Sequence, residues 1–198
     1  MTTTPSILFD HSAYLAKAIG YADYRRNMTA ELVSGAETKT AAYLPLNDSR
    51  MRRIEKTYTP GPEAIEKLDA MKGTLHWLVI SEHWCGDAAQ ILPVMNALAE
   101  ASHGRVRLSI VYRDANLELM DQHLTGTSRA IPKLVQLNTQ NEVLTTWGPR
   151  PAEAQDMVIA LRRDPATASS YSEPLHAWYA KDKHRSIERE LIALLPHN

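Results

Sequence analysis

The sequence of 198 residues contains a single cysteine, Cys85, so no disulfide bond can form within the chain. It also lacks an excess of either charge: 22 lysines and arginines stand against 23 aspartates and glutamates, for a formal net charge of −1. This balance gives no reason to expect binding to nucleic acid or to a membrane surface. A single thiol fits a reducing compartment, and the cytoplasm is therefore the expected location.

Long apolar runs are missing too, and none approaches the ~20 residues needed to span a bilayer. Residues 1–10 lack the basic region and apolar core of a signal peptide, so we expect none. The eight histidines show no His-x₃-His spacing, and one cysteine allows no Cys-x₂-Cys pair. We therefore expect no metal site and no bound cofactor. The composition, 44% hydrophobic and 23% charged, is ordinary for a globular domain with a sizeable core.

Residues 1–72 are predicted to form a helical N-terminal extension packed on the core. Apolar residues recur at spacings of three and four over about 12–34, which indicates a helix with one apolar face. Shorter stripes indicate helices at about 47–57 and 63–71, separated by a segment rich in proline and glycine.

The hydrophobic pattern changes after Gly73. From there we expect strands at 75–80, 106–112, 133–137 and 142–147, and helices at 87–102, 117–124 and 152–163. This β-α-β-α-β-β-α order predicts a parallel first pair of strands joined by a right-handed crossover, and an antiparallel hairpin at the end. Residues 164–198 are predicted to form a linker followed by one helix at about 174–195.

Cys85 lies where the first strand meets the following helix. Backbone N–H groups are unpaired at a helix N-terminus and the helix dipole favours an anion, so this is a reasonable place for a thiolate. Asp87 opposes that effect as a nearby like charge, whereas His83 could offset it or act as an acid or base. We expect a thiol moderately more acidic than a free cysteine.

Two motifs at these places resemble the thioredoxin superfamily. They are Trp84-Cys85-Gly86 at the first strand–helix junction and Ile131-Pro132 before the hairpin, and the resemblance covers residues 73–163. It implies an α/β thioredoxin-like fold with extra N- and C-terminal helices. It also implies a cis-proline at Pro132 beside Cys85. Trp84, Ile131 and Pro132 would then border a groove that binds extended peptides.

The sequence departs from this family at three positions that matter for its chemistry. Ala88 stands where the second active-site cysteine would be, and Asp87 replaces the usual proline. Val79 occupies the place of the buried acidic residue that accepts a proton. The usual dithiol cycle therefore cannot run within one chain.

Three hypotheses follow from the remaining groups. In the first, Cys85 is the nucleophile of a monothiol oxidoreductase tuned by Asp87 and His83. Its mixed disulfide would be resolved by glutathione as co-substrate, by a protein thiol, or by a second copy in a homodimer. In the second, the protein is a redox-inactive module that binds peptides or proteins. In the third, Cys85 helps to hold an iron–sulfur cluster, although Gly86-Asp87-Ala88 does not match the usual motif for that role.

Several other residues have simpler interpretations. Trp84 is expected to pack as a cover beside the cysteine whatever the activity. Arg129 could contact an anionic partner such as a glutathione carboxylate, but a solvated arginine is the simpler reading. His83 is most simply a solvated loop histidine. The basic residues Arg50, Arg52 and Arg53, and the run 181–185, are most simply solvated helix faces.

Overall fold

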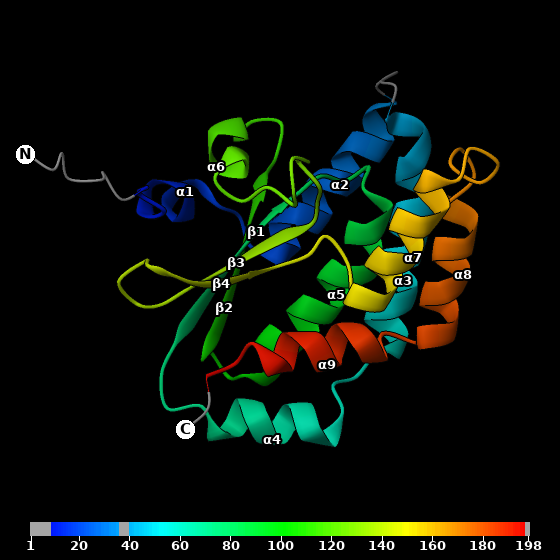
Figure 1. Cartoon of the computed structure of the whole chain (residues 1–198). Helices are drawn as coiled ribbons and strands as arrows, with labels where there is room; N and C mark the ends of the chain where they lie inside the picture. Colours follow the sequence, from blue (N-terminus) through cyan, green and yellow to red (C-terminus); the bar gives the residue numbers. More distant parts are fainter. Residues whose placement is uncertain (1–8, 36–39, 197–198) are drawn as a thin grey trace, which may run out of the picture.

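The computed structural model describes residues 9–35 and 40–196, so most of the segment tested for a signal peptide lies outside the described residues. Four strands form one mixed sheet in the order β2-β1-β3-β4 (Figure 1). Strand β1 pairs parallel with β2, and β3 pairs antiparallel with β4, as the sequence predicts. The structure adds an antiparallel pairing of β1 with β3, which joins the two pairs. The strands are β1 (Leu75–Ser81), β2 (Val106–Tyr112), β3 (Lys133–Leu137) and β4 (Val143–Trp147).

The central strand β1 forms the middle of the core. Its residues 77–80 are fully buried, which explains why its apolar run is nearly continuous rather than alternating. The indole N–H of Trp77 donates a hydrogen bond of 2.9 Å to Oε1 of Gln136 on β3. The amide of Gln136 then donates to the carbonyl oxygen of Leu194, so the C-terminal region is tied to the sheet.

Helix α5 (Gly86–Ala101) follows β1 directly and is buried along most of its length, including Pro93. Helix α3 (Leu44–Thr57) packs along α5, and α4 (Pro62–Ala70) packs against α5 and α9 (Arg185–Ala193). Helix α6 (Leu117–Asp121) lies on the other side of the sheet from α5 and α9 (Figure 1). Helix α7 (Ala152–Arg163) contacts α8 (Ser172–Asp182). No helix in the described residues is long and apolar enough to cross a membrane.

The single helix predicted over 12–34 is wrong: the chain forms α1 (Ser12–Lys17) and α2 (Tyr21–Ser34). Between them the backbone is extended at Ile19, whose N–H and C=O both bond to Ile110 of β2, at 2.9 and 2.8 Å. Because a β-bridge requires extended dihedrals, the helix is interrupted there, although the apolar stripe continues across the break.

The single helix predicted over 174–195 is also wrong, because α8 and α9 are separate. Lys183 and His184 lie between them with left-handed φ values of 52° and 67°. Two consecutive residues with left-handed backbone dihedrals end one helix and start the next in a new direction. Neither residue is glycine or asparagine, so the sequence carried no stop signal.

Two loops meet at the end of the hairpin. The Ile131–Pro132 peptide bond is cis, and so is the Gly148–Pro149 bond. Gly148 has a φ of +108°, and a Cβ atom there would lie 2.4 Å from the carbonyl oxygen of Pro132. Only glycine allows this approach, which brings the segment after β4 directly against the loop beside Cys85.

A buried histidine pair fastens α1 to the loop after α6. Nε2 of His11 and Nε2 of His123 lie 3.0 Å apart, so one ring donates a proton and the other accepts it. Burial, and after it the nearby His11 and Lys133, lower the pKa of His123 from its ordinary 6.5 to about 4. Both rings are therefore neutral at pH 7 in the folded protein.

We predict that acid weakens the folded state through this pair. Because the pKa of His123 is lower in the folded than in the unfolded chain, stability is lost as the pH falls from 6.5 towards 4. Urea unfolding at pH 7 and pH 5 measures this loss, and His123→Gln should show a smaller one than the wild type. An equal loss in both proteins would contradict the prediction.

Candidate functional site

Cys85 is the N-cap residue of α5. Its sulfur accepts a hydrogen bond from the N–H of Ala88 at 3.4 Å, and its S–H donates to the carbonyl oxygen of Ile131 at 3.2 Å. The structure therefore brings Cys85 and the Ile131–Pro132 turn together. The residue is only 7% exposed, so little of it can be reached from solvent.

The prediction that Cys85 has a lowered pKa is wrong, because the structure raises it. Burial, and after it the charge of Asp87, raise the pKa of Cys85 to about 12. The N–H groups of Ala88 and Asp87 act the other way, but they do not offset the loss of hydration. A thiol that donates a hydrogen bond to a carbonyl is also stabilised in its protonated form, so Cys85 is neutral at pH 7.

Asp87 is the centre of a buried polar cluster rather than only a helix-start residue. Nε and Nη2 of Arg150 donate to its Oδ2 at 3.2 and 2.5 Å, and the hydroxyl of Tyr179 donates to its Oδ1 at 2.7 Å. The side chains of Asp87 and Arg150 are 9% and 12% exposed. Arg150 reaches the cluster from the segment after β4 and Tyr179 from α8, so this carboxylate fastens both to the start of α5.

Helices α3 and α8 cover the start of α5 from outside. A Cβ atom on Gly86 would lie 3.2 Å from the ring of His176 on α8 and 3.4 Å from Nη1 of Arg50 on α3. Arg50 is half-buried, so its reading as a solvated arginine is wrong. Nδ1 of His176 is buried and has no hydrogen-bond partner in the described part of the chain. The terminal helices thus cover much of the surface next to Cys85.

His83 is buried, and its interpretation as a solvated loop histidine is therefore wrong. Its Nδ1 lies 2.7 Å from a carboxylate oxygen of Glu31, and its Nε2 lies 3.1 Å from the carbonyl oxygen of Tyr24 and 3.2 Å from the hydroxyl of Tyr112. These partners belong to α2 and β2. Within the described residues no hydrogen bond joins His83 to Cys85, so the ring serves the contact between α2 and the sheet.

The side chain of Trp84 is the part of the site next to Cys85 that solvent can reach. Its indole is half-buried and lies under the guanidinium of Arg113, 4.8 Å from the ring centre. Arg113 also donates to the carbonyl oxygen of Arg129, which joins the end of β2 to the loop before Pro132. The side chain of Arg129 makes a bidentate ion pair with Asp121 at 2.6 and 2.8 Å, so it is already engaged.

Sequence reasoning missed four residues of this site: Arg50, Arg150, His176 and Tyr179. Arg150 and Tyr179 lie 63 and 92 residues from Asp87, and nothing in their local sequence marks them. A buried Asp87 would have been a useful signal, because a buried carboxylate requires a cationic or hydrogen-bonding partner. No group of three or more potential metal ligands gathers anywhere in residues 9–35 and 40–196.

Comparison with known proteins agrees with this architecture. A PA1234 protein of unknown function from Pseudomonas aeruginosa has a TM-score of 0.64 at 16% identity, covering 94% of this chain and 97% of its own. An HIV epitope-scaffold protein has a TM-score of 0.56 at 18% identity, covering 89% and 97%. These likenesses show the fold. No curated protein matches the chain. A family model described as thioredoxin matches residues 36–165, well over half of the sequence, and the chain therefore belongs to the thioredoxin family.

Proposed function

We propose that this thioredoxin-like protein binds an extended peptide segment of a partner without using Cys85 as a nucleophile. The observation that carries the proposal is the buried, protonated thiol. With a pKa raised to about 12 and 7% of the residue exposed, Cys85 offers neither thiolate nor access at neutral pH. The second thiol of the family is absent as well, because Ala88 occupies its place.

The peptide would lie along the edge formed by Trp84 and the loop that leads to Pro132. Trp84 is half-buried beneath Arg113, and a Trp–Arg pair of this kind provides a rigid apolar surface with a polar rim. The carbonyl of Ile131 is used by the S–H of Cys85, so the thiol helps to fix the loop. In this proposal Cys85 has a structural role and the recognition comes from the neighbouring surface.

Monothiol exchange is the second candidate, favoured by the N–H of Ala88 that points at the sulfur. For that reaction, the thiolate of Cys85 would attack one sulfur of a partner disulfide and release the other as a thiolate. Glutathione or another external thiol would then resolve the mixed disulfide. This requires that partner binding uncover the sulfur and lower its pKa, since the resting state disfavours both.

Selection of displayed peptides distinguishes the two candidates. We expect Cys85→Ser to bind selected peptides as the wild type does, because the sulfur is not needed. Trp84→Ala should bind at least about tenfold more weakly, as for the loss of a central aromatic contact. Melting temperatures of both variants control for folding. Covalent capture of a cysteine-containing peptide on a non-reducing gel, lost in Cys85→Ser, would instead establish monothiol exchange.

A further inference from the structure

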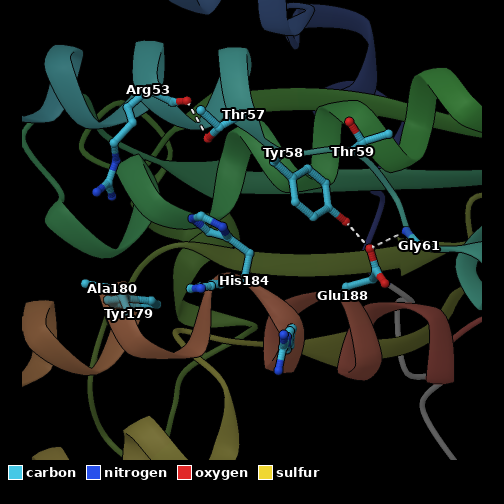
Figure 2. Close-up of a pocket in the computed structure, with 11 residues that line it drawn as sticks. Arg53, Thr57, Tyr58, Thr59, Gly61, Tyr179, Ala180, His184 and Glu188 are labelled. Carbon is cyan, nitrogen blue, oxygen red and sulfur yellow. Dashed lines mark hydrogen bonds between the residues drawn. The ribbon is translucent and has the colours of Figure 1, made fainter.

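A second site lies away from Cys85, in a hollow of about 540 Å³ between α3, α8 and α9 (Figure 2). This volume suits a small organic molecule rather than a bare ion. Its walls include the side chain of Tyr58 and part of Tyr179, and its rim includes three basic residues, Arg53, Lys183 and Arg185. These belong to the basic residues that the sequence suggested were only solvated helix faces.

The charges in the hollow are unbalanced. Across the described residues, no ion pair or hydrogen bond engages the cationic groups of Arg53, Lys183 or Arg185. The one carboxylate that lines the hollow, Glu188, is already held: the hydroxyl of Tyr58 donates to it at 2.5 Å and the N–H of Gly61 at 3.0 Å. Three free cationic groups thus face one engaged anion.

His184 adds a polar atom without a partner. Its ring projects into the hollow beside Tyr58, with ring centres 5.8 Å apart (Figure 2). Its Nε2 is buried and has no hydrogen-bond partner in the part of the chain that the structure describes. Buried polar atoms are nearly always paired, so an unpaired ring nitrogen beside unpaired cations indicates a missing ligand.

The turn that builds the hollow holds these groups in place. Lys183 and His184 both have left-handed φ values, which cost free energy in residues other than glycine. Within the described residues, the nearby carboxylate of Asp182 makes no ion pair with the basic groups; it accepts hydrogen bonds from the backbone N–H and hydroxyl of Ser186. The arrangement therefore presents Lys183, His184 and Arg185 together, opposite Arg53.

From this geometry we infer that the hollow between α3, α8 and α9 binds a small polyanionic molecule through phosphate or carboxylate oxygens. Arginine and lysine suit both kinds of oxygen, and the ring of Tyr58 would contact the rest of the ligand. Pyrophosphate and citrate serve as probes for the two chemistries, at constant ionic strength set with potassium chloride.

Calorimetric titration of the full chain tests the inference. We expect saturable binding of at least one probe, weakened about tenfold or more in Arg53→Gln/Lys183→Gln, which removes two charge-assisted contacts. The matched control is Lys56→Gln/Lys181→Gln, which removes two exposed lysines from α3 and α8 outside the hollow and should bind like the wild type. Melting temperatures without ligand should agree among all three proteins.

The probe that binds identifies the chemistry, and either one supports the inference. Failure of both probes to saturate would overturn it. Equal weakening in the two double variants would also overturn it, because it would show a general response to net charge rather than a site.

Discussion

Alkylation of Cys85 by iodoacetamide should be very slow at pH 7 in the native protein and should rise about tenfold per pH unit up to at least pH 10. Burial, together with the charge of Asp87, raises the pKa of this thiol to about 12. A free cysteine near 8.5 has roughly three thousand times more thiolate at pH 7, since each pKa unit above the pH costs a factor of ten. Limited access to the sulfur should slow the reaction further.

Mass spectrometry of the labelled protein measures this rate, and Cys85→Ser gives the background. Circular dichroism at each pH shows whether the fold persists. Labelling in concentrated urea provides the internal reference, because the unfolded chain should react with the ordinary cysteine profile. A rate that levels off between pH 7 and pH 9 in the native protein would contradict a buried protonated thiol and would favour monothiol exchange.

Asp87→Asn should destabilise the protein by about 3–5 kcal/mol, the usual cost of leaving one member of a buried ion pair unpaired. Arg150 would lose its charged partner and keep its 2.7 Å bond to Oε1 of Gln155, and Tyr179 would lose a charged acceptor. Urea unfolding followed by tryptophan fluorescence gives the free energy. The same variant should lower the pKa of Cys85, since Asp87 is the second cause of its elevation.

Asp121→Asn is the matched control for this variant. Asp121 also makes a bidentate pair with an arginine, Arg129, but both side chains are nearly half-exposed. Exposed pairs contribute little, so the effect on unfolding should be far smaller than for Asp87. A double variant, Asp87→Asn with Arg150→Met, should recover part of the lost stability. Equal losses in Asp87→Asn and Asp121→Asn would mean that the buried cluster does not hold the terminal helices.

The order of the strands along the chain and the position of Cys85 could be predicted because their signals are local. The apolar run at Leu75–Ser81 indicates a buried strand. The two motifs at Cys85 and Pro132 lie where the topology brings them together. The two wrongly predicted helices, over 12–34 and 174–195, are broken by features that leave no local signal in the sequence. Ile19 leaves its helix to pair with Ile110, and Lys183 with His184 turns without a glycine, so tertiary contacts overrode the apolar period.

The environment of Cys85 could not be predicted for a related reason. A helix N-terminus favours a thiolate wherever it occurs, but burial depends on what covers it. The groups packed on the neighbouring Gly86 and Asp87 come from Arg50, Arg150, His176 and Tyr179, which are scattered along the chain. The sequence therefore identified the position of Cys85 at the start of a helix. Its pKa depends on burial by residues that belong to no recognisable motif.

The bridge between Ile19 and Ile110 also covers part of a sheet edge through which two molecules could associate. Strand β2 is at the margin of the sheet, where unpaired N–H and C=O groups can recruit a strand from another molecule. Ile19 occupies the backbone groups of Ile110 in the middle of that margin, and α1 and α2 lie against β2 on either side of it in sequence. A chain shortened to begin after Ile19 would uncover this margin, and we expect it to aggregate more readily than the full chain.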